Sequence, residues 1–288
     1  MKVGSQAHKE LFCQSFIESY QDYEPETLPW PQLDDAALAR LRGIPFWQIA
    51  LQTERQAGVM VSAFAETITD PMIREAIALQ AKEETRHGRL LEFLIKHYDV
   101  QIAEPAPPTV PPNIAQEFID FGFGECLDSY FAFGMFELAR QTNYFPEALF
   151  TIFDPILYEE ARHIVFFVNW VSYMQVHEGR GLAPLRVAHA GVHYGRALLH
   201  LAKSFTSAGG STGESFTAAG AGAFTDNLTP ARVFSVCLQE NEKRMSSFDD
   251  RLLQPRLLPK LSAIALQMLK LLPQRQSTPN PEVSPSNL

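Results

Sequence analysis

Two five-residue segments of this chain carry residue types that bind transition metals. Glu-Glu-Thr-Arg-His ends at His87, and Glu-Glu-Ala-Arg-His ends at His163. On a helix, residues three apart share a face, so Glu84 lies beside His87 and Glu160 beside His163. A carboxylate and an imidazole together suit iron or manganese. One such segment is typical of a surface ion pair, whereas two nearly identical copies predict two halves of one metal site.

The remaining charged residues of the two segments can orient the histidines. A metal-bound histidine usually donates its second ring N–H to a carboxylate. Glu83 stands four residues before His87, as Glu159 does before His163, so we expect each glutamate to orient the histidine of its own helix. We expect the arginines of the segments to keep these glutamates ionised. They are Arg86 and Arg162.

A dinuclear site needs one further carboxylate from each of two other helices. Glu54 stands 15 residues before Thr69 and Glu84 stands 15 after it, so a turn near Thr69 would place the two acids level. The helix before the second segment offers Glu125 and Glu137, which are 12 residues apart and cannot both face one centre. The distance to the following turn favours Glu125 as the fourth carboxylate, with Glu137 as the alternative.

The charge of such a site supports a metal. Four ionised carboxylates inside an apolar bundle would each cost several kcal/mol if they were unpaired, and two divalent cations would balance them. Cys126 follows Glu125 but points about 100° away from it on a helix, so no cysteine joins the set and structural zinc is disfavoured. The alternative interpretation is two salt-bridged surface faces, which the apolar residues around both segments disfavour.

The elements that must position these residues are long helices separated by prolines. Hydrophobic periodicity and the caps at Asp70-Pro71 and Pro146 predict four of them, the last bent at Asp154-Pro155. Residues 104–112 contain too many prolines for a helix and predict an extended crossover about as long as the helices. The expected arrangement is therefore a helix pair, a crossover and a second pair. The predicted helices cover residues 45–68, 70–98, 113–143 and 146–177.

Further elements are predicted on both sides of these helices. His189 and His193 are four residues apart, but no acid stands beside them in the sequence, so core or surface histidines are favoured over ligands. The apolar helix at 257–272 is expected to dock on the bundle, with binding to a membrane surface or a partner through its apolar stripe as the alternative. The expected units are an N-terminal helical extension (1–44), the bundle (45–178), additional helices with a flexible Gly/Ser/Ala loop at 206–224 (179–273), and a disordered tail (274–288).

The predicted ligand set resembles that of the ferritin-like carboxylate-bridged di-iron proteins. Its acid-Glu-x-Arg-His form is similar to the oxygen-activating branch, which includes bacterial multicomponent monooxygenase hydroxylases and the small subunit of class I ribonucleotide reductase. The resemblance covers about residues 45–178 and implies an all-α, ferritin-like four-helix bundle with a long crossover between helices 2 and 3. The residues that carry it are Glu54, Glu84, His87, Glu125, Glu160 and His163.

The resemblance also implies a cofactor and an activity. Glu84 and Glu160 would bridge two iron ions, with manganese as the alternative, Glu54 and Glu125 would be terminal ligands, and each histidine would bind one ion. The centre would activate O2 and oxidise a small, largely apolar organic substrate, with electrons from a ferredoxin- or flavin-type reductase. We expect apolar residues near the ligands to line a substrate pocket, or else to be ordinary core. They are Trp47, Gly58, Val61, Gly122, Ala132, Phe136 and Phe167.

Two other classes of function remain open from the sequence. The same ligands would serve a ferritin-type ferroxidase or a manganese catalase, which handle metal or peroxide without an organic substrate. A non-catalytic helical binding protein is the third hypothesis.

Composition limits the class of protein and the compartment in which it is expected. Of its 288 residues 46% are apolar, which excludes a disordered chain, and a formal net charge of −9 without a basic block disfavours nucleic acid. Three widely spaced cysteines predict a reducing compartment. Without a signal peptide or a membrane-spanning run in the sequence, we expect a soluble cytoplasmic protein without membrane contact, open to forming a homodimer.

Overall fold

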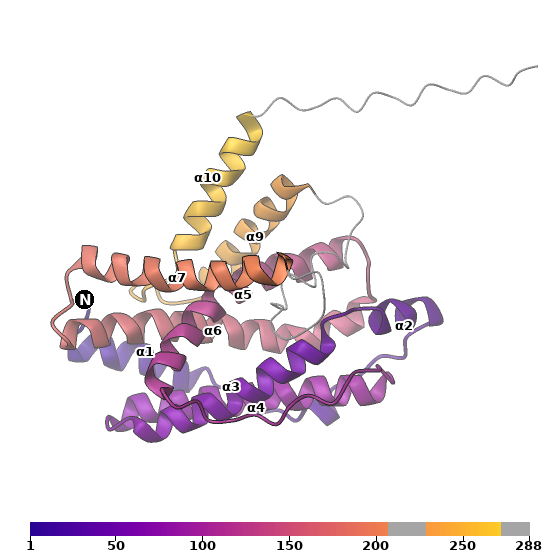
Figure 1. Ribbon diagram of the computed structural model, residues 1–288, viewed down its shortest axis with the longest axis horizontal. Helices are drawn as coiled ribbons and strands as arrows, with labels where there is room; N and C mark the ends of the chain where they lie inside the picture. The colour runs from indigo at the N-terminus through magenta and orange to yellow at the C-terminus, as the bar shows by residue number, and fades with distance from the viewer. Residues whose placement is uncertain (207–228, 272–288) are drawn as a thin grey trace, which may run out of the picture.

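The computed structural model describes residues 1–206 and 229–271, and across these residues the chain is all-α, with no strand. The predicted tail at 274–288, and the predicted loop at 206–224 after its first residue, lie outside the described residues. Four long helices form the body of the molecule (Figure 1). They are α3 (Trp47–Thr67), α4 (Pro71–His97), α5 (Ile114–Gln141) and α6 (Glu147–His177).

The ends of these four helices fall within two residues of the predicted ones. Asp70 caps α4 as predicted, because its side chain accepts hydrogen bonds from the backbone N–H groups of Met72 and Ile73 and Pro71 begins the helix. α6 continues through Pro155 as one helix. α3 packs along α4 and α5 packs along α6, so each half of the predicted site belongs to one helix pair.

The proline-rich link between α4 and α5 is extended, as predicted. Residues 100–111 contain no helix or turn, and Figure 1 shows the link running along α3 and α4. Gln56 of α3 fastens it, since its side-chain amide donates to the Thr109 carbonyl at 2.7 Å and accepts from the Thr109 N–H at 3.0 Å. The link therefore joins the two helix pairs as a strap held against α3.

The N-terminal extension covers one side of the body. α1 (Gln6–Glu18) packs on α4 and α6, and its last turn lies against the second Glu-Glu-x-Arg-His segment. A short 3-10 helix (Pro25–Thr27) contacts α4, and α2 (Asp35–Arg42) leads into α3. Phe12 and Phe16 of α1 are buried in the same apolar cluster as Phe166 of α6, so burial of these rings holds α1 in place.

Three further helices pack around α5. α7 (Ala183–Thr206) and α9 (Pro230–Met245) both contact α5, and α10 (Leu257–Leu271) contacts α9. A side chain at Gly134 would meet Cys237 Sγ at 2.3 Å, so this glycine lets α9 approach α5 closely. No helix among the described residues combines the length and the apolar character needed to cross a membrane.

The prediction that residues 257–272 dock on the bundle is correct only at the base of α10. Leu258 and Ser262 are buried, whereas Ile264, Met268 and Leu271 are exposed. Figure 1 shows α10 rising away from the other helices. The sequence missed this because an apolar helix does not reveal which of its turns reach a partner.

Candidate metal centre

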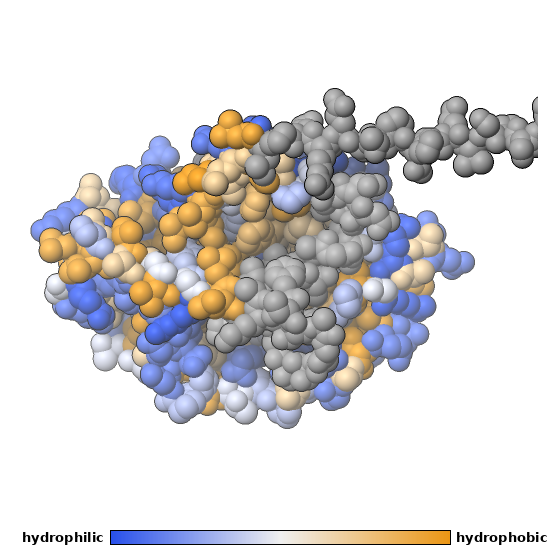
Figure 2. All heavy atoms as spheres, turned by 45° about the horizontal axis from the view of Figure 1, so that its top comes forward, coloured by the Kyte–Doolittle hydropathy of each residue, from blue (hydrophilic) through white to orange (hydrophobic). Residues whose placement is uncertain are grey.

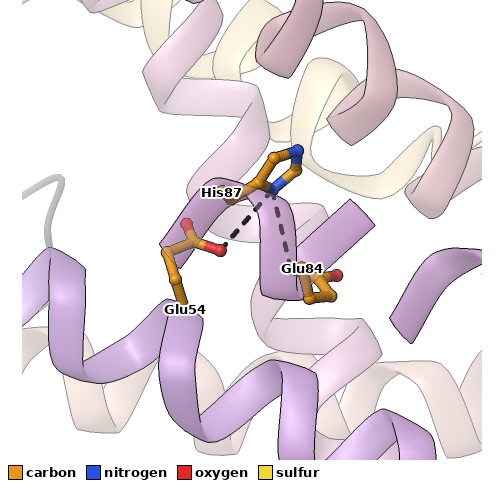
Figure 3. A group of neighbouring side chains, drawn as sticks. All are labelled: Glu54, Glu84 and His87. Carbon is orange, nitrogen blue, oxygen red and sulfur yellow. Dashed lines mark ion pairs between the residues drawn. The ribbon is translucent and has the colours of Figure 1, made fainter. Parts of the chain in front are cut away.

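Six side chains from four helices converge inside the body of the molecule. In one half of this cluster the carboxylates surround His87, whose Nδ1 atom lies 3.5 Å from Glu54 and 3.3 Å from Glu160. Figure 3 shows how Glu54 of α3 reaches across to His87 and Glu84 of α4. The converging residues are Glu54, Glu84, His87, Glu125, Glu160 and His163, the set picked out from the sequence.

The second half mirrors the first across the centre. His163 Nδ1 lies 3.2 Å from Glu84 and 3.8 Å from Glu160, and the two imidazole rings are 5.9 Å apart between centroids. Glu84 also lies 3.8 Å from His87 Nδ1. Glu84 and Glu160 therefore each approach both histidines, which is the placement that bridging between two metal ions requires.

The donor atoms fit a pair of metal ions. Two groups of three have all their ligand atoms within 4.8 Å of one another, and Glu84 belongs to both. The Nδ1 atoms of His87 and His163 are buried and have no hydrogen-bond partner, although such atoms are rarely left unpaired. Two buried imidazole nitrogens facing carboxylates are the donor arrangement of a carboxylate-histidine metal site. The other residues of the two groups are Glu54 and Glu125.

The histidines are oriented across the helix pairs, and the prediction that each takes the glutamate of its own helix was wrong. His87 Nε2 lies 2.8 Å from Glu159 of α6, and His163 Nε2 lies 2.8 Å from Glu83 of α4. Each histidine with an Nε2–H donating to this glutamate turns Nδ1 toward the centre. The pairing is reciprocal because α4 and α6 run antiparallel past each other at this level.

The two arginines also pair across the helices. Arg86 donates to Glu159 at 2.6 Å, and Arg162 donates to Glu83 at 2.6 Å. All four side chains are buried, so each arginine places a positive charge beside a buried carboxylate. The prediction that these arginines hold the two glutamates is confirmed, with partners from the opposite helix in place of the same one. Arg86 additionally reaches Glu83 at 3.8 Å.

Charge within the centre is distributed unequally among the carboxylates. Burial would raise the pKa of Glu84, but the charge of His163 outweighs it and lowers the pKa to about 2. Burial raises the pKa of Glu125 well above its usual value, and the nearby Glu160 carboxylate adds to the rise. Burial also raises the pKa of Glu54 to about 7.

The histidines shift in the opposite sense from most buried bases. Burial alone would lower the pKa of His87, but the hydrogen bond with Glu159 and the close approach of the Glu160 carboxylate raise it well above the usual value. The pKa of His163 is raised in the same way, mainly by Glu84. Both shifts reflect the carboxylates packed around the two rings, which favour positive charge at this position.

The geometry decides between the two candidates on α5. Glu125 belongs to one of the metal-compatible groups. Glu137 belongs to neither group and accepts a hydrogen bond from Gln141. Glu137 also lies 3.9 Å from Arg140 in a partly exposed ion-pair cluster. Glu125 therefore stands in the place proposed for the fourth carboxylate.

An apolar cavity of about 130 Å³ adjoins the centre. Glu54, His87, Glu125 and Glu160 line it together with three further polar residues, Thr53, Asp128 and Ser129, and it follows α5 through Ala132 and Phe136 toward Ala139. Its other apolar walls come from α3, α4, α6 and the residues that precede α3 and α6: Ile44, Phe46, Trp47, Ala50, Leu91, Phe145, Leu149, Phe150, Phe153, Ile156 and Leu157.

Four residues expected in this pocket lie outside it. Gly58 packs against Thr85, where an added Cβ would meet Thr85 Oγ1 at 2.7 Å, and Gly122 packs against Phe167, where the distance would be 2.2 Å. Val61 is fully buried in the core. These two glycines allow close helix contacts, and the space beside them is occupied by Thr85 and Phe167. Trp47, Ala132 and Phe136 are the predicted pocket residues that line the cavity.

Several polar residues around the centre were not identified from the sequence. Ser129 donates to Glu160 at 3.3 Å and Gln80 donates to Glu84 at 3.2 Å, so each supports an ionised carboxylate. Tyr23, from the N-terminal extension, donates to Glu159 at 3.3 Å. Ser129 and Gln80 stand four residues from Glu125 and Glu84, a spacing that could have indicated them, whereas nothing local marks Tyr23.

The histidine pair on α7 does have an acidic partner, contrary to its appearance in the sequence. His193 Nδ1 lies 2.5 Å from Asp120 of α5, and its ring stacks on Phe123. The sequence could not show this because the acid comes from a different helix. His193 is therefore a buried histidine with a satisfied ring nitrogen, the kind of residue that was favoured over a ligand.

Comparisons with protein-family models, curated proteins and solved structures found no match to this chain. What can be said about its function therefore rests on the side chains described above.

Proposed function

We propose that α3, α4, α5 and α6 form a ferritin-like bundle around a carboxylate-bridged di-iron centre, and that the protein is an O2-dependent oxygenase or oxidase. The observation that carries the proposal is the pair of buried, unpartnered Nδ1 atoms of His87 and His163, facing carboxylates that come from all four helices. Glu84 and Glu160 would bridge the ions, with Glu54 and Glu125 as terminal ligands. Two ferrous ions would supply the electrons that reduce O2.

The chain's own residues would perform the remaining tasks. Glu83 and Glu159 hold the Nε2–H groups of the histidines, which keeps both Nδ1 atoms aimed at the ions. The apolar walls of the adjoining cavity exclude water and select an apolar substrate. Because the cavity is lined by Glu54, His87, Glu125 and Glu160, the substrate would approach the centre from the side that these four residues face.

The electrons would come from a separate protein. The three cysteines of the chain are buried and unpaired, and they lie on different helices, so they offer no site for an iron–sulfur cluster. We therefore propose a ferredoxin- or flavin-type reductase as electron donor. Free thiols also support a cytoplasmic location.

Metal analysis of two variants tests the centre. The purified protein loaded anaerobically with ferrous iron is expected to bind two ions per chain, and Glu84→Ala is expected to lose both because Glu84 contacts both histidines. His163→Ala should lose at least one. Glu66→Ala, on the exposed face of α3, is the matched control and should keep both ions. Full occupancy in Glu84→Ala, with helix content preserved by circular dichroism, would contradict the proposal.

Oxygen consumption separates an oxygenase or oxidase from the other metal-dependent functions. Reduced, iron-loaded protein should consume O2 slowly alone and faster with small apolar organic molecules, because these occupy the cavity beside His87. Turnover of hydrogen peroxide by manganese-loaded protein, or rapid ferrous oxidation unaffected by any organic molecule, would instead identify peroxide defence or metal handling.

A further inference from the structure

The exposed hydrophobic side chains of this protein are gathered on two helices. Ten of the twelve large hydrophobic residues that are exposed in the described ranges lie on α10 or on α7 and the residue before it. Figure 2 shows hydrophobic residues collected on the face that carries these helices. They are Leu182, Leu185, Val187, Val192, Leu198, Leu199, Leu261, Ile264, Met268 and Leu271.

The solvent side of α7 is apolar along its length. Leu185, Val192 and Leu199 are seven residues apart and therefore form one stripe, and all three are exposed. The opposite side of α7 is also occupied, since Tyr194 is buried against Cys126 and Phe123 of α5. A helix that is apolar on both sides is normally covered on both sides. The stripe thus requires an occupant.

α10 presents a second apolar surface with the same requirement. Its base is held by the buried residues Leu258 and Ser262, and its outer turns project from the body (Figure 1). Ile264, Met268 and Leu271 are respectively 54%, 64% and 85% exposed on those turns. A projecting helix whose apolar side chains are in water is stabilised when those side chains enter an apolar phase.

The charges of the two helices indicate what covers these apolar surfaces. α7 and α10 together contain five lysines and arginines and no acidic residue, in a chain with a formal net charge of −9. Arg196 lies 3.8 Å from Asp120 of α5, whereas Lys260 and Lys270 of α10 are exposed. A second copy of the chain would bring like charges together on this face, and neither helix offers a carboxylate to pair with them. An anionic lipid surface supplies both hydrocarbon for the apolar side chains and phosphates for the basic ones.

We propose that α7 and α10 dock this protein on the surface of anionic phospholipid bilayers. The helices lie in the headgroup region with their apolar side chains in the outer part of the hydrocarbon, and neither of them spans the bilayer. This departs from the sequence-based expectation that the protein makes no membrane contact. For α10 the proposal takes up the alternative to docking on the bundle, and the absence of a spanning helix among the described residues does not bear on surface attachment. The proposal is independent of the metal centre.

Flotation with lipid vesicles tests the proposal on the full-length chain. The protein should float with vesicles of phosphatidylcholine and phosphatidylserine and remain in solution with phosphatidylcholine alone. High salt should release it, because the attraction of exposed basic residues to lipid is screened. Absence from the anionic vesicles at low salt would overturn the proposal.

Two sets of variants localise the contact. Lys260→Glu with Lys270→Glu should weaken binding at least tenfold, since each exposed basic residue near an anionic surface contributes about fivefold. Leu185→Gln with Val192→Gln and Leu199→Gln should also abolish flotation. Lys82→Glu and Val110→Gln are the matched controls, being exposed residues of the same types on α4 and the strap, and should bind as the wild type does.

The variants also distinguish lipid from a second copy of the chain. The wild-type chain is expected to sediment as a monomer in analytical ultracentrifugation without lipid. A dimer that the three glutamine substitutions convert to monomer would show that this face is covered by another copy, and would overturn the lipid proposal. Because all the substituted side chains are exposed, we expect each variant to fold. Circular dichroism and thermal melting check that it does.

Discussion

The two Glu-Glu-x-Arg-His segments are nearly identical in sequence, yet they lie in different surroundings. The segment of α6 is enclosed by α1, whose Phe16 ring lies 6.0 Å from His163, and Arg162 donates to both the Phe16 carbonyl and Ser19. The segment of α4 lies against residues 20–23, which contact Arg86, and its His87 lines the apolar cavity, as Glu160 of the α6 segment does. We call the side of His163, which α1 encloses, the closed side, and the side of His87, which lines the cavity, the open side.

This difference assigns unlike tasks to two like motifs. Within the proposed function, the ion beside His163 is enclosed and the ion beside His87 faces the substrate cavity. The repeated motif thus determines which side chains meet at the centre. The segments that pack against each copy determine which molecules can reach those side chains. Substitutions placed at equivalent positions of the two halves should have unequal effects.

The largest difference is expected between the two arginines. Arg162→Met leaves the buried Glu83 without its arginine partner and also removes two hydrogen bonds to the end of α1, so we expect a loss of about 3–5 kcal/mol in the free energy of unfolding. Arg86→Met should cost roughly half as much, because Glu159 keeps the Tyr23 hydroxyl as a donor. Urea denaturation of both variants measures the difference; equal losses would remove the distinction between the halves.

The crossed orientation of the histidines can be tested by a double-mutant cycle. Glu83→Gln should weaken the affinity for one metal ion about 10- to 100-fold through His163, although Glu83 belongs to the helix of His87. The effect should disappear in a His163→Ala background and persist in His87→Ala. Competition with a chelator measures the affinities, and the reverse pattern would show that each histidine takes the glutamate of its own helix.

Packing should respond oppositely near the closed core and in the open cavity. Gly122→Ala is expected to cost about 1–3 kcal/mol of stability, because the new methyl group would overlap the Phe167 ring. Ala132→Val extends into the cavity and should change stability by less than about 0.5 kcal/mol. Thermal melts of the two variants give the comparison. A large loss in Ala132→Val would show that the cavity is filled by neighbouring side chains.

The smallest effect is a pH dependence confined to the closed side. Burial lowers the pKa of His8 below that of the unfolded chain, and the charge of Arg186 adds to the lowering. The neutral ring accepts from the Gly4 N–H and bonds to Asn169 at 3.0 Å. The unfolded chain therefore binds the proton more readily. The His8 contribution is complete above the unfolded pKa, about 6.5, and is lost as the pH falls below it.

Comparison with His8→Gln isolates this contribution. Between about pH 7.5 and 5.5, the wild type should lose up to about 1 kcal/mol more stability than the variant. Tyr23 covers the open side, and burial raises its pKa to about 12, so Tyr23→Phe should show no added pH dependence in this range. A constant difference between the wild type and His8→Gln would mean that His8 does not titrate.

Much of the arrangement could be predicted because helix periodicity acts locally. The spacing within each segment placed Glu84 with His87, and turn arithmetic placed Glu54 at the same level. The partner of each histidine could not be predicted, because a glutamate four residues away and one on a facing helix both satisfy the ring N–H. Gly122 and Phe167 were misplaced because a glycine in a helix indicates equally a pocket and a close contact. The role of Tyr23 depends on a loop that carries no periodic pattern.

The strap between α4 and α5 has a consequence for how the chain could be divided. It links two helix pairs, and the histidine of each pair is oriented by a glutamate of the other. A protease cut at the exposed residues near Val110 would produce two fragments, neither of which carries a complete set of ligands. The fragments would have to find each other to bind metal, so recovery of iron binding on mixing would report their association directly.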